Sequence, residues 1–78
     1  MSRPIKRSLT IAGHRTSLSL EAPFWEALKT AAREERLPVA ALIARIDAGR
    51  VGGGLSSAVR VWIFERYRRA LLPRREVC

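Results

Sequence analysis

The stretch His14–Leu20 (HRTSLSL) decides how this chain folds, because its polar and apolar residues alternate. Thr16, Leu18 and Leu20 fall on one side of an extended backbone, and Arg15, Ser17 and Ser19 fall on the other. A period of two is typical of a β-strand. Helical patterns follow directly, so we expect this strand to be an unpaired edge or to pair with a second copy of the chain.

The length of 78 residues predicts a single domain, residues 1–78, whose small core needs support from oligomerisation. A disulfide within the chain is excluded because Cys78 is the sole cysteine, and one histidine, His14, makes a metal site or other cofactor improbable. Such cysteine usage is typical of a reducing cytoplasm. No apolar run approaches the ~20 residues of a membrane span.

The net charge of +8 is concentrated at the two ends of the chain. Residues 1–20 hold four basic residues and no acidic one, whereas the basic and acidic residues of 21–59 balance. Residues 60–78 hold six arginines against two glutamates. This distribution favours a polyanionic partner, either nucleic acid or an anionic membrane surface.

Two segments precede the first helical pattern: a flexible basic arm over residues 1–6 and a strand region over residues 7–21. Residues 7–11 (RSLTI) alternate as well, and Ala12-Gly13 could turn the chain back. A hairpin between 7–11 and 15–20 is therefore a second possibility, although Ala-Gly is a weaker turn than Asn-Gly.

The rest of the chain reads as three helices. Residues 22–48 form two of them, separated at Arg36-Leu37-Pro38 because proline cannot continue a helix interior. A glycine-rich linker over 49–54 leads to a third helix over 55–72, with a tail over 73–78. The predicted fold is mainly α with one short strand. The third helix should bury one broad apolar side (Val59, Trp62, Ile63, Tyr67, Ala70, Leu71).

The order of strand, helix, turn and helix resembles the ribbon-helix-helix superfamily, which includes the Arc- and MetJ-type repressors. The segments AGHRTSLSLE and LSSAVR resemble one bacterial subfamily of small ribbon-helix-helix proteins in particular, and the similarity covers 6–69. The resemblance implies an intertwined homodimer, in which the strands of two chains form an antiparallel ribbon above four helices. It also answers the question of the missing strand partner.

The resemblance further implies a transcriptional regulator whose ribbon enters the major groove of double-stranded DNA. By register, Arg15, Ser17 and Ser19 would meet the bases, since arginine pairs with guanine and serine accepts or donates to any base. The phosphate contacts would come from Lys6, Arg7, Arg36 and Val39. In the superfamily the start of the second helix binds a phosphate with backbone N–H groups. Pro38 has none, and Arg36 would be strained if the turn requires a positive φ.

Two other classes of function compete with this interpretation. An antitoxin-like or adaptor module would bind another protein through the third helix, and a basic helix could lie on an anionic membrane. We favour DNA over both partners and expect no membrane association. An enzyme is not expected, because the sequence contains no acid–base or metal-ligating constellation. Glu21 is interpreted as a cap of the first helix, and Ser56 or Ser57 as a cap of the third.

Overall fold

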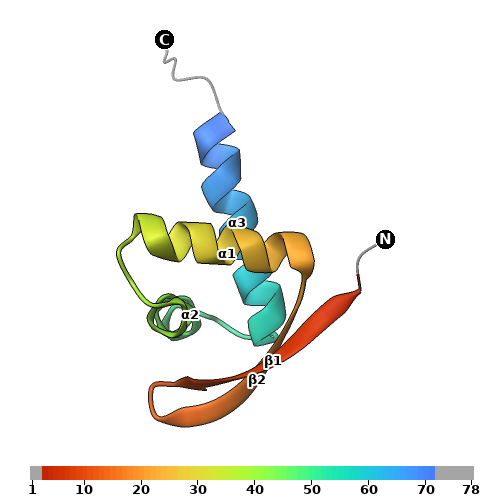
Figure 1. The fold of residues 1–78 in the computed structure, drawn as a ribbon, viewed down its shortest axis with the longest axis vertical. Coiled ribbons are helices and arrows are strands. Elements are labelled where there is room, and N and C mark those ends of the chain that lie inside the picture. Colours follow the sequence, from red (N-terminus) through yellow and green to blue (C-terminus); the bar gives the residue numbers. More distant parts are fainter. Residues whose placement is uncertain (1–2, 72–78) are drawn as a thin grey trace.

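A computed structural model describes residues 3–71, in which a two-stranded sheet precedes three helices (Figure 1). The strands are β1 (Pro4–Ile11) and β2 (His14–Glu21), and the helices are α1 (Ala22–Glu34), α2 (Val39–Ala48) and α3 (Leu55–Leu71). Among the described residues, no helix is long and apolar enough to cross a bilayer. The expected tail and the end of the third helix, residues 72–78, lie outside the described part.

The two strands form an antiparallel hairpin, so the expectation of one short strand without a partner in its own chain is wrong. The register runs from Ile11 opposite His14 to Pro4 opposite Glu21. Ala12 (φ 51°) and Gly13 (φ 83°) connect the strands, and positive φ at both central residues is what a type I′ turn requires. The two-stranded sheet is therefore made within one chain. Residues 4–6 belong to β1 instead of a flexible arm.

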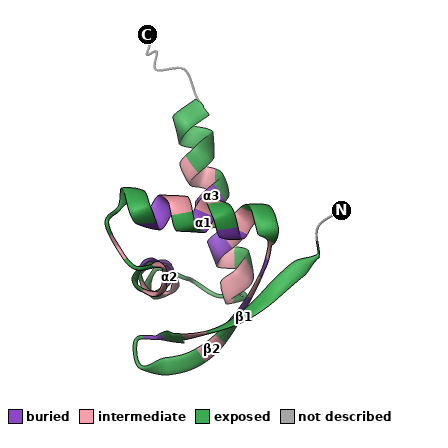
Figure 2. Cartoon of the chain, in the orientation of Figure 1, coloured by how far each residue is buried: buried purple, intermediate pink, exposed green. Residues whose placement is uncertain are grey.

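The core lies between one face of this hairpin and the three helices. Leu18 and Leu20 point into it and are fully buried, as their alternation predicts. Each helix adds its own apolar residues, and those without exposed surface are Leu28, Ala31, Leu42, Ile43 and Val59. Figure 2 shows the buried residues on the sides of the helices that face one another, while β1 is largely exposed.

The turn between α1 and α2 is closed by backbone hydrogen bonds around Arg36. The Arg36 N–H donates to the Arg33 carbonyl at 3.1 Å, and the Leu37 N–H donates to the Ala32 carbonyl at 2.9 Å. This pair of bonds is a Schellman motif, whose central residue adopts the left-handed conformation. Arg36 does so with φ 58°, which is the strained backbone expected for a non-glycine residue there.

The third helix, α3, crosses the body of the molecule and then extends beyond it (Figure 1). Only Val59 and Ile63 among its residues are buried. The expected broad buried side is wrong for its C-terminal half, where Tyr67, Ala70 and Leu71 are exposed. Phe64 and Val61 are also more than half exposed. Within residues 3–71, α3 therefore keeps an apolar surface in contact with solvent.

Candidate functional site

The candidate site is the face of the hairpin that points away from the helices. The register places four cross-strand pairs on this side. The pair at the end of the hairpin, Pro4–Glu21, lies where Glu21 bonds to Arg60 of α3. The other three are Lys6–Ser19, Ser8–Ser17 and Thr10–Arg15. Residues directly opposite each other in an antiparallel pair project to the same side of the sheet. We call the six residues of the other three pairs the outer face. All are polar, and all except the half-buried Ser19 are exposed.

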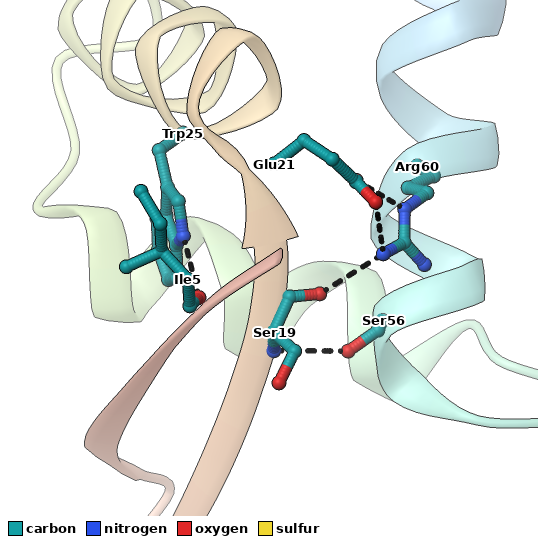
Figure 3. A network of polar contacts seen from close by, with 6 residues as sticks. All are labelled: Ile5, Ser19, Glu21, Trp25, Ser56 and Arg60. Atoms are coloured by element: carbon teal, nitrogen blue, oxygen red, sulfur yellow. Dashed lines mark hydrogen bonds and ion pairs between the residues drawn. The ribbon is translucent and has the colours of Figure 1, made fainter. Parts of the chain in front are cut away.

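The direction of this face is set by its reverse side, part of which belongs to the core. Leu18 and Leu20 alternate with Ser17 and Ser19, so burial of the leucines fixes the direction of the serines. The Trp25 indole N–H donates to the Ile5 carbonyl at 2.9 Å, which ties β1 to α1 (Figure 3). These contacts fix the side of the sheet to which the polar residues point.

The outer face offers hydrogen-bond donors and acceptors in an arrangement that suits a polyanion. Arg15 and Lys6 supply cationic donors, and the hydroxyl groups of Ser8, Thr10 and Ser17 both donate and accept. A two-stranded β-ribbon has dimensions that the major groove of B-DNA admits. Polar side chains on the face of the ribbon can then reach base edges, and its cationic side chains can reach phosphates.

The structure brings together some of the residues predicted from the sequence and separates others. Arg15, Ser17 and Ser19 lie on one face, with Lys6 directly opposite Ser19. Arg7 lies on the other face, opposite Leu18, and its guanidinium stacks 5.2 Å from the centre of the Trp25 ring. Cation–π contact of this kind occupies one side of the guanidinium and leaves its N–H groups free to bind.

The other two predicted phosphate residues lie in the turn between α1 and α2. Arg36 is exposed, and Val39 is the first residue of α2, with Pro38 as its N-cap and without a side-chain cap. The first N–H groups of a helix have no partner inside it, so those of Val39 and Ala40 are oriented to receive an anion. Neither Arg36 nor Val39 belongs to the outer face.

A polar network connects the start of α3 to the end of β2 (Figure 3). The Ser19 N–H donates to Ser56 Oγ at 3.1 Å, and the Arg60 guanidinium donates to the Ser19 carbonyl at 3.3 Å. Arg60 Nε also donates to Glu21 Oε1 at 2.9 Å. This hydrogen bond from Arg60 holds the pKa of the Glu21 carboxyl below its usual value.

These contacts correct two roles predicted from the sequence. Glu21 is the N-cap residue of α1 by position, but its side chain makes no cap hydrogen bond and pairs with Arg60. Ser56 lies inside α3 and receives the backbone N–H of β2. Capping is a local preference, whereas both partners here lie more than 35 residues away along the chain.

The charges of the described residues are divided between the helices and the hairpin. Every carboxylate within residues 3–71 lies within ion-pair distance of a basic side chain. Across the same range, no ion pair involves Lys6, Arg7 or Arg15. Within this range the helical region also keeps three arginines without an ion pair, Arg33, Arg36 and Arg69, so unpaired cations lie both on the hairpin and on the helices.

Sequence reasoning did not assign Ser8 and Thr10 to the site, although their signal is present. Both occupy polar positions in the alternating segment RSLTI, residues 7–11. Had that segment been taken as the partner of residues 15–20, the register would have placed Ser8 and Thr10 beside Arg15 and Ser17. The hairpin was only the second possibility from the sequence, because Ala12-Gly13 is a weak turn sequence.

The comparisons with known proteins agree with this geometry. A family model described as "Ribbon-helix-helix domain" matches residues 4–67, from the start of β1 to near the end of α3. Neither the curated proteins nor the solved structures gave a match. The matched region covers most of the chain and includes the whole hairpin. The chain therefore belongs to the ribbon-helix-helix domain family.

Proposed function

We propose that this protein is a transcriptional regulator that inserts its β-ribbon into the major groove of double-stranded DNA. The observation that carries the proposal is the outer face, six polar side chains on a hairpin whose reverse side contributes Ile11, Leu18 and Leu20 to the core. Ribbon-helix-helix domains are generally DNA-binding transcription regulators or antitoxins, and they typically dimerise.

Each predicted residue has a defined part in this proposal. Arg15 pairs with guanine O6 and N7, and Ser17 and Ser19 contact neighbouring base edges. Lys6 reaches a phosphate from the same face, and Arg7 reaches one from the rim beside Trp25. Arg36 and the Val39 N–H contact a phosphate outside the groove. Ser19 contributes less than Ser17, since α3 partly covers it.

The decisive experiment measures DNA affinity after Arg15→Ala. A bound DNA sequence is first selected from a random pool at physiological salt. Arg15→Ala should then weaken binding to that sequence about ten- to a hundred-fold, as the loss of a bidentate base contact predicts. Circular dichroism melting should stay unchanged because Arg15 is exposed.

Arg68→Ala is the matched control for this experiment. It removes the same charge from α3, where Arg68 pairs with Glu65 of the same helix. We expect little loss of DNA affinity in this variant. Equal losses in Arg15→Ala and Arg68→Ala would contradict base reading by the ribbon and leave only general electrostatic attraction.

The exposed apolar surface of α3 favours a second candidate function, an antitoxin-like or adaptor module. Val61, Phe64 and Leu71 are each more than half exposed. A pocket of about 520 Å³ between the end of α2, the glycine linker and α3 includes Val61 and Trp62. Exposed apolar patches of this kind commonly mark protein contacts. Cross-linking in cells should then capture a stoichiometric partner that is lost in Phe64→Asp and kept in Arg15→Ala.

A further inference from the structure

We propose that the pocket between the end of α2, the glycine linker and α3 binds a small organic acid with an apolar body. Its volume of about 520 Å³ lies in the range of about 300–1,000 Å³ that is typical of small-molecule sites. None of the six outer-face residues lines it. The site is therefore separate from the surface assigned to DNA, and its occupation does not depend on DNA binding.

The apolar lining of the pocket comes from two helices. Ile46 of α2 is buried, and Ala58 and Trp62 of α3 are half-buried beside the exposed Val61. The three α3 residues share one side of the helix, because they are three and four positions apart. The Trp62 ring is held by the Arg66 guanidinium, which lies 5.4 Å from its centre. An aromatic or aliphatic body in the pocket would remove apolar surface of Val61 and Trp62 from water.

The glycine linker forms a wall of this pocket without side chains. Gly52 and Gly53 have positive φ values of 113° and 73°, which residues with a Cβ atom rarely adopt. The Arg50 guanidinium donates to Asp47 Oδ1 at 2.8 Å and also to the Gly53 carbonyl, so it ties the linker to the end of α2. A Cβ atom added at Gly52, Gly53 or Gly54 would meet no atom within 4 Å. The wall is thus held in place and leaves open space beside it.

The charges around the pocket favour an anionic ligand. Two arginines, Arg45 and Arg50, line it together with one acidic residue, Glu65. The Glu65 carboxylate already accepts a hydrogen bond from Arg68 of the same helix at 2.7 Å. A carboxylate or sulfonate attached to an apolar body therefore matches this lining better than an amine does.

Arg45 is the residue that we assign to the acid group. Its contact with Glu35, at 3.6 Å, is the longest ion pair within residues 3–71. The other oxygen of Glu35 accepts from Arg66 at 2.9 Å, so that carboxylate keeps a partner if Arg45 turns away. Arg50, in contrast, is engaged by Asp47 and the linker. Arg45 can therefore turn toward an acid in the pocket, and a guanidinium binds a carboxylate through two parallel N–H groups.

The first experiment follows isotope-labelled protein by NMR while naphthoate is added, and repeats the titration with naphthamide, its uncharged amide. Naphthoate should shift the resonances of residues 52–54, Val61 and the Trp62 indole until they saturate. Naphthamide should bind at the same place about two- to five-fold more weakly, as expected for loss of one ion pair at an exposed rim. Equal affinities of the two probes, or no saturable shift with naphthoate, would overturn the proposal.

Two pairs of variants test the lining and the charge separately. Val61→Asp should abolish naphthoate binding, whereas Phe64→Asp should not, because these side chains are 58% and 61% exposed on α3 but only Val61 lines the pocket. Arg45→Gln should weaken naphthoate about two- to five-fold and leave naphthamide unchanged. Its control is Arg33→Gln of α1, which removes a charge away from the pocket. Equal losses in a variant and its control would show unspecific binding and contradict the site.

A second copy of the chain is the competing occupant of this surface. Diffusion and resonance positions measured over a series of protein concentrations distinguish it from a small acid. We expect the affinity for naphthoate to be the same at every concentration. Resonances of Val61 and Trp62 that shift in step with dimer formation, together with loss of naphthoate binding in the dimer, would assign the pocket to a contact between copies and overturn the proposal.

Discussion

Arg36 shows how a single residue can carry strain in an otherwise consistent turn. The Schellman hydrogen bonds that end α1 require a left-handed residue at this position, and Arg36 supplies it with φ 58°. This conformation costs a residue with a Cβ atom roughly 1–2 kcal/mol, and glycine pays no such penalty. Pro38, two residues later, prevents α1 from continuing through the turn, because proline cannot occupy a helix interior.

Arg36→Gly should therefore stabilise the protein by about 1 kcal/mol, less a few tenths for the greater freedom of glycine in the unfolded chain. Chemical denaturation would measure the change in the free energy of unfolding. Arg33→Gly is the matched control three residues earlier, inside α1, where glycine should destabilise by about 0.5–1 kcal/mol. Destabilisation by both variants would show that the turn does not impose a left-handed residue.

For individual residues, patterns in the neighbouring sequence predicted the burial of some side chains but not the hydrogen-bond partners of others. Leu18 and Leu20 are buried because alternation fixes which side of a strand they occupy. The strain at Arg36 could be predicted, because the turn has an arginine at the position where a glycine is usual. The partners of Glu21 and Ser56 could not be predicted, since both belong to elements far away in the sequence.

Among the elements, the hairpin was the hardest to predict and α2 the easiest. The break predicted at Arg36-Leu37-Pro38 lies directly before the observed start of α2 at Val39. For β1, the alternation of residues 7–11 was present, but the weak turn at Ala12-Gly13 left the hairpin as the second possibility. Arg7 lies on the inner face of the hairpin, where its guanidinium stacks over the Trp25 ring, a contact that the sequence pattern does not predict.

The placement of α3 depends on ion pairs to its neighbours, which makes it sensitive to acid. Arg60 bonds to Glu21 of β2, and Arg66 bonds to Glu35 at the end of α1. Hydrogen bonds from these arginines lower the pKa of both carboxyls from the usual 4.5. Because the pKa is lower in the folded state, the unfolded chain binds protons more readily than the folded one. The stabilisation is therefore complete above pH 4.5, and it is lost as the pH falls through the lowered pKa values.

We expect the free energy of unfolding to decrease below about pH 4.5 in the wild type, and to decrease less steeply in Glu21→Gln and Glu35→Gln. The double variant should show the flattest profile, because each glutamine removes one proton-binding difference between the folded and unfolded states. Denaturation curves recorded between pH 3 and 7 at constant ionic strength measure it. A double variant as acid-sensitive as the wild type would contradict a role for these pairs.

For the molecule as a whole, the sequence predicted the family, which the match over residues 4–67 confirms. The homodimer with an intermolecular ribbon stays a prediction, although β1 supplies β2 with one strand partner inside the chain. The charge at the N-terminal end was visible in the sequence. Which cations keep an ion-pair partner was not visible, because that depends on how the helices place their carboxylates beside their own arginines.

The hairpin cations have no ion pair within residues 3–71, so the salt dependence of DNA binding tests whether DNA lies on the hairpin. Each phosphate contact made by a cation contributes about 0.9 to the slope of log K against log salt. Lys6 has no ion-pair partner within residues 3–71, whereas Lys29 pairs with Glu26 of α1 at 3.0 Å. Lys6→Gln should therefore lower the slope by about 0.9 and weaken binding to all sequences alike, while Lys29→Gln should change neither. Affinities measured by fluorescence anisotropy across a salt series would show it, and equal slopes in the two variants would mean that DNA does not lie on the outer face.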